Sequence, residues 1–320
     1  GGDAGGFRHD GTVLSGYLEV DYRFVPNALA GLAASYSSLD LTATNEAEGK
    51  ATLTGSLVNA YPYGLWMPEP WLRIWGMAGL GTGASDLATD HGGLPDESLL
   101  AWLGAAGQRA ELWSGDGVSV AARSDGFVTG IRHSSHGAMP EVHALAWRAR
   151  VLLEAGLEAR PPNARLSGLV ELGARLDGGD AQRGLGGEAG AELRYTHTGL
   201  GLGLAGRGRL LLVHEDPGIR EWGASAALTW TPRDPGSGPS LSVRPSWGRP
   251  ASGTDALWRD PDAVLASDGS ASSIPDRSWL PDAVDVTVSY GLDGLEIEVF
   301  GRHDGGAGAY RFGVGGSLEY

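Results

Sequence analysis

The chain contains no cysteine among its 320 residues. This absence excludes disulfides, thiolate catalysis and cysteine-ligated metal sites together. It also suits a chain that crosses an oxidising periplasm while unfolded, where stray thiols would pair wrongly.

Long apolar runs are missing as well. Hydrophobic residues make up 42% of the chain, yet none of its stretches approaches the roughly 18 consecutive apolar residues that a transmembrane helix needs. The composition therefore excludes a helical membrane protein. Residues 1–6 are mostly glycine, without a basic start or an apolar core, so we expect no signal peptide within this chain.

Basic residues are scarce. Lysine and arginine total 24 against 39 aspartates and glutamates, which gives a net charge of -15. Nucleic acid is thereby excluded as a partner, because phosphate recognition calls for clustered basic residues. The acidic residues are spread along the chain rather than gathered in a tail.

What the sequence does have is a period of two. Apolar or small residues alternate with polar or charged ones in the segments 14–24, 143–160, 165–176, 188–195 and 310–320. Such alternation indicates strands whose two faces meet different surroundings. Helical periodicity does not compete with it in these segments.

Extending this pattern predicts about fifteen strands, mostly 9 to 16 residues long. A tilted membrane strand needs about 9 to 11 residues, whereas strands in soluble sheets usually have about five or six, so the lengths favour the membrane. A merged or misassigned pair would give 14 or 12 strands. The predicted strands are 12–24, 28–40, 50–62, 70–82, 98–113, 117–129, 143–158, 163–176, 185–198, 200–214, 220–231, 238–249, 283–291, 294–302 and 308–320.

The number of strands decides which face lies inside. A soluble barrel of this size would enclose a lumen too wide for side chains to fill. We therefore expect an all-β, closed antiparallel transmembrane barrel of about 14–16 strands, apolar outside and polar inside. One domain, 12–320, would form the barrel, and the glycine-rich segment 1–11 would be a linker or the remnant of a first strand.

The connections predict an orientation, because such barrels have short periplasmic turns and longer extracellular loops. Counting back from Tyr320 predicts periplasmic turns at 25–27, 63–69, 114–116, 159–162, 199, 232–237 and 292–293. The extracellular loops would be 41–49, 83–97, 130–142, 177–184, 215–219, 250–282 and 303–307. An even barrel of 16 strands would then need one more strand before residue 12.

Aromatic residues gather near the ends of the predicted strands. Membrane barrels carry such girdles at the headgroup level, although ordinary core aromatics are the alternative. The girdle candidates are Tyr61, Tyr63, Trp66, Trp71, Trp75, Trp222, Trp230 and Trp247.

Several segments carry a family resemblance. They are 17–24 (YLEVDYRF) with 30–36, 61–63 (YPY) with 72–81, 171–180 (ELGARLDGGD), 211–216 with 221–225, and 241–248 (LSVRPSWG). Together they resemble the translocator barrels of autotransporters, which belong to type V secretion. The resemblance covers most of the chain. It departs from the family in two ways: helical linker sequence is missing before residue 12, and the strand count exceeds the family's usual twelve.

The resemblance implies an integral outer-membrane barrel that exports or displays an N-terminal passenger, here upstream of Gly1. It implies the lipid bilayer with its lipopolysaccharide and the barrel-assembly machinery as partners. The terminal signal for assembly would comprise Phe312, Leu318 and Tyr320. A passive diffusion pore and a surface hydrolase remain the alternatives.

The inward charges are the main candidate site. In a translocator they would hydrate and hold a threaded segment, and in a pore they would set ion preference. The simpler alternative is that they pair across strands and make a polar lining. The candidates are Glu19, Asp21, Arg23, Arg73, Arg109, Arg123, Arg148, Arg150, Glu154, Glu158, Arg165, Glu171, Arg175, Glu188, Glu192, Arg194, Arg207, Arg244, Glu296, Glu298, Arg311 and Glu319.

Residues that suggest other chemistry are explained better by loops. His133, His136 and His143 in or beside one loop, and the run 214–216 (HED), contain acid–base or metal-ligating groups. Asp177 and Asp180 lack the ligand repeat of a calcium loop, and the glycines of 201–206 precede no helix. We therefore expect neither catalytic residues nor a metal site nor a cofactor.

Overall fold

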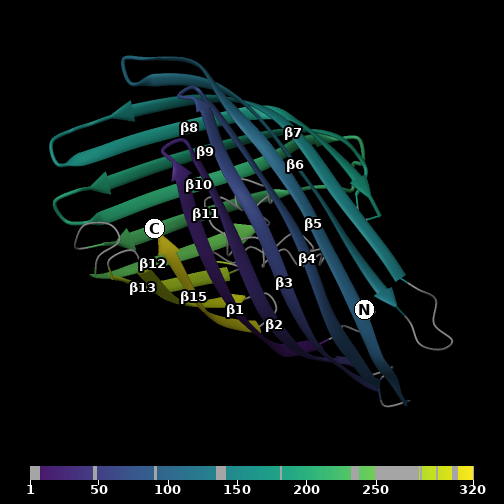
Figure 1. Ribbon diagram of the computed structural model, residues 1–320. Coiled ribbons are helices and arrows are strands. Elements are labelled where there is room, and N and C mark those ends of the chain that lie inside the picture. Colours follow the sequence, from purple (N-terminus) through teal and green to yellow (C-terminus); the bar gives the residue numbers. More distant parts are fainter. Residues whose placement is uncertain are drawn as a thin grey trace, which may run out of the picture.

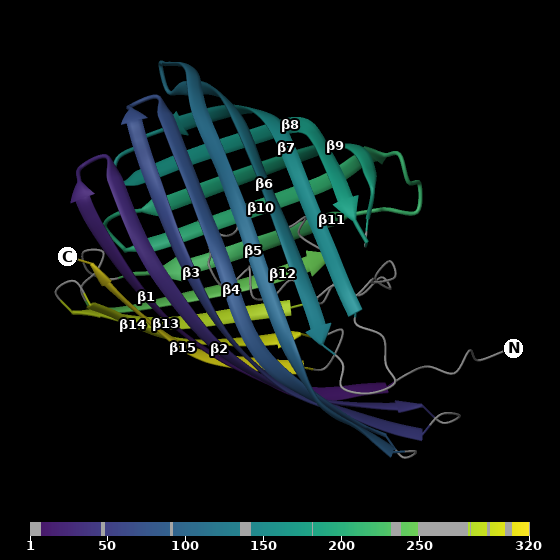
Figure 2. The same cartoon turned by 45° about the vertical axis from the view of Figure 1, so that its right-hand side comes forward.

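The computed structural model describes residues 8–45, 49–89, 92–134, 142–180, 182–231, 238–248, 281, 283–292, 295–304 and 309–319. These residues form one sheet that closes into a barrel of fifteen strands (Figures 1 and 2). In the part described, none of the residues forms a helix long and apolar enough to cross a membrane. For some strand residues near the two ends of the chain, only the backbone is described.

The strands follow one another around the barrel in chain order. Their bounds are β1 Arg8–Val25, β2 Ala28–Asn45, β3 Gly49–Glu69, β4 Leu72–Thr89, β5 Gly92–Gly115, β6 Val118–Ser134, β7 Val142–Ala159, β8 Ala164–Gly179, β9 Gly184–His197, β10 Leu202–His214, β11 Trp222–Trp230, β12 Gly238–Gly248, β13 Ala283–Leu292, β14 Leu295–Asp304 and β15 Ala309–Glu319.

The barrel closes through a parallel pair. Each strand is antiparallel to the next, but β1 and β15 run in the same direction, with Thr12 opposite Tyr310 and Asp21 opposite Glu319. With an odd number of sequential antiparallel strands, the first and last must point the same way. The expectation of an antiparallel barrel is thus correct except at this seam, and the expected even strand number does not hold for the described strands.

The two ends of the barrel differ. At one end, which we call the turn end, strands are joined by short turns such as Pro26–Asn27, while the opposite end, the loop end, carries the connections 135–141 and 249–282. The strands β2 to β5 have 18 to 24 residues, whereas β11 to β15 have 9 to 11. In Figure 2 the long strands project beyond the short ones at the loop end.

The predicted loops 41–49 and 83–97 and the predicted turn 63–69 are wrong for most of their length. β2 and β3 extend to Asn45 and from Gly49, β4 extends to Thr89, and β3 continues to Glu69. These segments lie between the predicted strands. Their residues continue the strands instead, although both faces of this part are only partly apolar and the period of two is weaker there.

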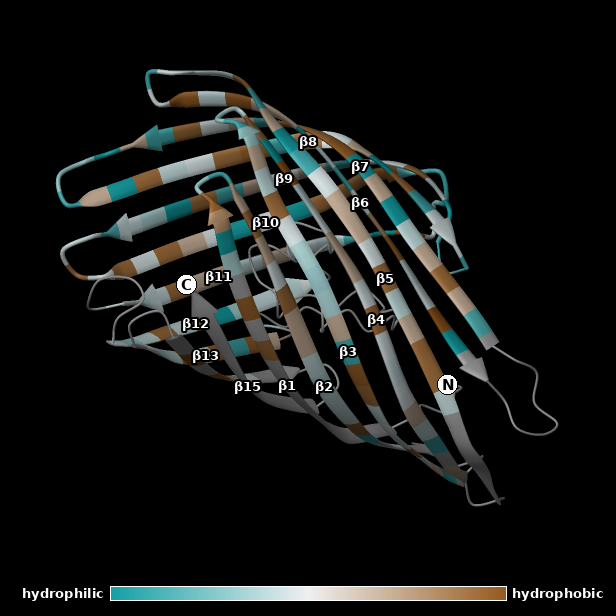
Figure 3. Cartoon of the chain, in the orientation of Figure 1, coloured by the Kyte–Doolittle hydropathy of each residue, from teal (hydrophilic) through white to brown (hydrophobic). Residues whose placement is uncertain are grey.

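The outer face of the sheet is apolar. Figure 3 shows hydrophobic and hydrophilic residues alternating along the strands. On β7, Leu153 is 60% exposed while its neighbours Leu152 and Glu154 are 1% and 2% exposed. Leu172 on β8 and Leu193 on β9 are similarly exposed. The hydrophobic side chains therefore face outwards and the buried charges face the interior, the opposite of a soluble barrel.

Candidate functional site

A network of ion pairs covers the inner face of β5 to β11, and Arg150 lies at its centre. Its Nε and Nη2 donate to the two carboxylate oxygens of Asp125, both at 2.9 Å. Its Nη1 donates to Glu188 Oε1 at 3.2 Å. All three side chains are 1% exposed. A bidentate pair of this kind fixes geometry as well as charge.

A second group of ion pairs lies nearer the loop end. Arg148 donates to Asp177 at 2.5 Å, and Arg175 lies 2.8 Å from Asp177 and 2.5 Å from Glu221. Gln182 joins the group by accepting from Arg148 and donating to Glu221, both at 3.1 Å. Glu221 precedes β11, so these contacts tie the β10–β11 connection to β7 and β8.

A third group lies nearer the turn end. Arg109 donates to Glu154 at 2.7 Å, and Arg123 lies 3.7 Å from the other oxygen of Glu154. Arg209 Nε donates to Glu171 Oε1 at 3.0 Å. Several of these pairs bridge strands that are not neighbours, such as β5 with β7 and β8 with β10. Side chains converge in this way on the concave side of a curved sheet.

Glycines on β9 leave room for the longest bridges. Gly186 lies in register between Arg175 on β8 and His214 on β10, and Gly190 lies between Glu171 and Arg209. A Cβ added at Gly190 would collide with the carboxylate of Glu171. The inner face of β9 is therefore bare at these points, and side chains of β8 cross it to reach β10 and the residue before β11.

Replacing Gly190 with valine is expected to separate Glu171 from Arg209, because the new side chain occupies the space of that carboxylate. Breaking a buried ion pair costs up to about 3 to 5 kcal/mol. The loss should appear as a lower unfolding temperature, followed by β-sheet circular dichroism. Gly206→Val is the matched control, since a Cβ at Gly206 meets nothing within 4 Å. An equal drop in unfolding temperature in the two variants would contradict the role of Gly190 in letting Glu171 reach Arg209.

The charges of the network balance one another. Its cations are six arginines and its anions six carboxylates, namely Arg109, Arg123, Arg148, Arg150, Arg175 and Arg209 against Asp125, Glu154, Glu171, Asp177, Glu188 and Glu221. This arrangement matches the simpler alternative for the inward charges, pairing across strands. A wall that neutralises itself offers little net field to a passing ion.

Glu221 is held ionised although it is buried. Burial alone would raise its pKa, but hydrogen bonding to Arg175, the charges of Arg148 and Arg175 and the hydrogen bond from Gln182 outweigh it and lower the pKa to about 2. The contacts of the β10–β11 connection therefore persist at any physiological pH.

The pH dependence of stability follows from this shift. Because the folded pKa of Glu221 lies below its ordinary value of 4.5, its contribution is complete above pH 4.5 and is lost as the pH falls towards 2. Unfolding temperatures of the wild type and Glu221→Gln should differ most near neutral pH and converge at the acidic end. A difference that does not change across this range would show that the Glu221 charge does not stabilise the fold.

The remaining predicted charges lie in different surroundings. Besides the network, the structure pairs Glu158 with Arg160 and Arg165 at the turn end and Glu192 with Arg194. Arg23 and Arg73 are exposed, and Arg207 and Arg244 are half-buried. The side chains of Glu19, Asp21, Glu296, Glu298, Arg311 and Glu319 lie outside the described ones.

Four members of the network were missed: Asp125, Asp177, Arg209 and Glu221. The first three follow Arg123, Arg175 and Arg207 at a spacing of two, so the alternation already places them on the inner face. Glu221 lies before β11 and outside any strand. Periodicity gives no signal for such a residue.

Small polar groups lie on the opposite wall. Asn59 on β3 donates to the hydroxyl of Ser35 at 3.2 Å, and both are buried. The hydroxyls of Ser240 and Ser289, on β12 and β13, lie 2.6 Å apart. On the same wall Arg244 lies in register with Asp285, so the small polar groups stand among charged positions.

The aromatic prediction is partly wrong. Trp66, Trp71, Trp222 and Trp230 are exposed at strand ends, and Trp247 lies opposite Ala224 on the outer face. Tyr61, Tyr63 and Trp75 occupy odd positions, which face inwards on β3 and β4. The ring of Tyr61 comes within 2.6 Å of an ideal Cβ on Gly79, and Trp75 lies over Gly107 in the same way.

Exposed tryptophans missed at first include Trp102 and Trp113 on β5. On β11, Trp222 and Trp230 occupy the first and last positions. They are eight residues apart, each residue advances about 3.4 Å along the strand, and the strand is tilted by about 40° from the barrel axis. The two tryptophans are therefore separated by roughly 21 Å along that axis. That height is close to the about 25 Å of a membrane barrel's apolar band.

The described histidine candidates lie in different surroundings. The side chain of His214 is fully buried, with Nδ1 accepting from the backbone N–H of Asp216 at 3.0 Å and Nε2 lying 3.4 Å from Asp177. His143 is exposed, the side chain of His133 is not described, and His136 lies outside the described residues. Among the described residues, no group of three or more potential metal ligands occurs.

The assembly-signal prediction stays a prediction. Phe312 and Leu318 lie in β15, where their backbones pair with Gly301 and Leu295 of β14. Tyr320 lies outside the described residues.

Comparison with protein-family models and with curated protein sequences finds no match. Several solved structures are similar, among them CdiB and the siderophore receptor PirA. CdiB from Acinetobacter baumannii is 10% identical, with a TM-score of 0.44 over 91% of this chain and 56% of its own. The siderophore receptor PirA from Acinetobacter baumannii is 8% identical, with a TM-score of 0.33 over 98% of this chain and 58% of its own. This chain spans less than two thirds of either, and we draw function from its own residues.

Proposed function

We propose that this chain is an integral outer-membrane β-barrel, with its turn end in the periplasm and its loop end outside the cell. The observation that carries the proposal is the inverted polarity of a closed sheet. Exposed leucines cover its outer face, while charges such as Arg150 are 2% exposed inside. Only a lipid surrounding makes this distribution stable, because water would leave the apolar face uncovered.

We propose further that the barrel exports or displays a polypeptide carried upstream of Gly1. The resemblance to autotransporter translocators suggests this role, and the balanced inner wall is compatible with it, since a self-neutralising lining does not hold a passing chain by net charge. In this role the partners are the lipopolysaccharide around the loop end, the assembly machinery and the exported segment.

The membrane assignment is tested by fractionation and gel mobility. The protein should sediment with outer membranes and migrate faster unheated than boiled on a detergent gel. Recovery in the soluble fraction without detergent would contradict the assignment. A tagged polypeptide fused before Gly1 tests export separately: it should become sensitive to protease added to intact cells.

A passive pore is the second candidate, and the small polar groups of Ser35, Asn59 and Ser289 on the inner wall favour it. A pore would conduct steadily in planar bilayers with little preference for cations or anions, because the opposing ion-paired wall is balanced. Export would then fail while conductance persisted.

A further inference from the structure

Towards the loop end, the polar and the apolar residues of the sheet change faces. There the long strands β2 to β5 continue past Tyr36, Val58, Leu80 and Leu100, and we call residues 37–45, 49–57, 81–89 and 92–99 the loop-end extension. On its outer face Asp40, Thr54 and Asp86 lie in one register row and are exposed. The apolar belt therefore ends where the extension begins.

The inner face of the extension carries leucines, with glycine and serine positions such as Gly55 and Ser85 between them. We call Leu39, Leu53, Leu57, Leu99 and Ile131 the leucine face. The four leucines are half-buried and Ile131 is 45% exposed. In the backbone register, positions 41, 87 and 94 lie in the row of Leu53, which crosses β2 to β5. Ile131 lies on β6, beside the extension.

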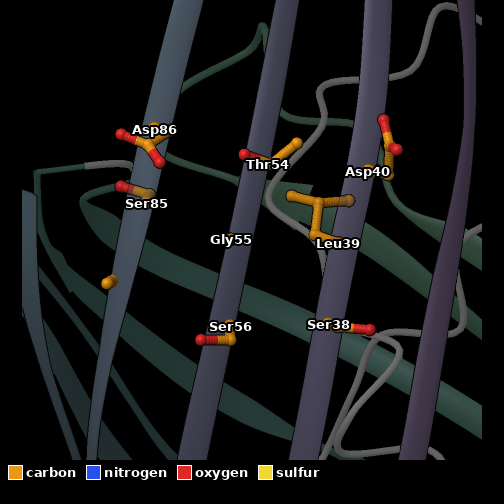
Figure 4. A pocket seen from close by; sticks show the side chains of 9 residues that line it. Ser38, Leu39, Asp40, Thr54, Gly55, Ser56, Ser85 and Asp86 are labelled. Atoms are coloured by element: carbon orange, nitrogen blue, oxygen red, sulfur yellow. The ribbon is translucent and has the colours of Figure 1, made fainter. Parts of the chain in front are cut away.

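A hollow lies in this part of the sheet (Figure 4). Gly55 is at its centre, with Leu39 and Ser85 in register on either side. Six of its nine lining residues lie on the outer face, namely Ser38, Asp40, Thr54, Ser56, Ala84 and Asp86, and Leu53 and Leu57 do not line it. The hollow therefore belongs to the polar outer face of the extension, on the side opposite the leucine face.

We infer that the leucine face docks an apolar, extended segment of the polypeptide that the barrel carries. The inference rests on the proposed export function. The leucine face continues the interior surface, because Leu57 and Asn59 lie on the same strand and the same face. A chain that leaves the lumen along β2 to β5 passes over it directly.

The chemistry of the face selects this occupant. The described side chains of the leucine face carry no charge, so an apolar segment loses no ionic solvation there and buries the leucines. Lipid is a poor alternative, because the polar row of Asp40, Thr54 and Asp86 keeps this part of the sheet out of the hydrocarbon.

Disulfide trapping tests the inference. Because the chain has no native cysteine, only the introduced cysteines can form disulfides. A test polypeptide fused before Gly1 carries one cysteine within a valine–threonine repeat. We expect it to form a disulfide with Leu53→Cys and none above background with Thr54→Cys. The two sites are adjacent on β3 but lie on opposite faces, and heat-modifiable gel mobility checks that both variants fold.

A third site separates the two proposals. Ser242→Cys on β12 lies on the inner face away from the extension. Trapping at 242 without trapping at 53 would overturn the leucine-face inference and leave export intact. Trapping at neither site, with the fused polypeptide absent from the cell surface, would overturn export as well.

Two further outcomes would also overturn the inference. One is equal trapping at 53 of a glycine–serine segment, which would indicate passage without apolar docking. The other is a disulfide between Leu53→Cys and Trp258→Cys without any fusion, which would assign the face to the chain's own segment 249–280. Reduced trapping of the valine–threonine segment after Leu57→Asp, but not after Ser56→Asp, would support it.

Discussion

Replacing Arg150 with leucine is expected to destabilise the barrel by about 3 to 5 kcal/mol, because removing the cation of a buried ion pair leaves its carboxylate partners short of positive charge. Asp125 keeps its ion pair with Arg123 at 2.8 Å, but it loses the bidentate partner. Arg150 is the shared partner of Asp125 and Glu188, and all three side chains are 1% exposed. Its loss would leave two carboxylates inside the wall. The free energy of unfolding in urea, measured in detergent or lipid vesicles, reports the loss.

The matched control is Arg194→Leu. Arg194 pairs with Glu192 at 2.9 Å, but its side chain is 55% exposed. Solvent-exposed pairs contribute about 0 to 1 kcal/mol, so this variant should unfold almost as the wild type does. If Arg150→Leu were as stable as Arg194→Leu, the ion-paired wall would not hold the barrel together.

The second large effect concerns the outer belt. Leu153 lies within β7 and is 60% exposed on the outer face. Arginine there should cost about 2 to 4 kcal/mol if the position lies near the bilayer midplane. Thr54→Arg, on the outer face of the loop-end extension, should cost little because that position lies beyond the belt.

The measurement is the unfolding free energy in vesicles, with the same variants compared in detergent. In the proposed barrel, the bilayer contacts β7 at Leu153 and leaves the extension at Thr54 in water. Equal losses of unfolding free energy for Leu153→Arg and Thr54→Arg would contradict this arrangement. A larger cost at Thr54 would place the belt at the wrong height.

The alternation of residues was enough to predict the barrel and the inward position of Arg148, Arg150 and Arg175, because sheet periodicity acts on every strand. It did not predict which carboxylate each arginine binds. Arg150 pairs with Glu188 two strands away, and such a contact depends on the curvature and register of the closed sheet. The parallel seam likewise follows from the strand number, which needs every boundary to be right.

The loop-end extension was only partly predicted, because the predicted strands end at residues 40 and 82 and the next ones begin at 50 and 98. Asp40 and Asp86 have low strand propensity, yet they lie in register beside Thr54 on neighbouring long strands. The tyrosine assignments were wrong for a related reason. Proximity to a turn suggested a girdle, whereas the odd numbering of Tyr61 and Tyr63 places them inside.

The most direct test of the central claim is a scan of single cysteines along β3, Gly49–Glu69, each carrying an environment-sensitive fluorophore in vesicles. Fluorophores at even positions from Val58 to Trp66 should be quenched by lipid-borne quenchers. Those at even positions from Lys50 to Ser56 should be quenched by aqueous quenchers. Those at odd positions near Asn59 should not be quenched by lipid-borne quenchers. Lipid quenching without a period of two, or none at Val58 and Ala60, would contradict the membrane-spanning barrel.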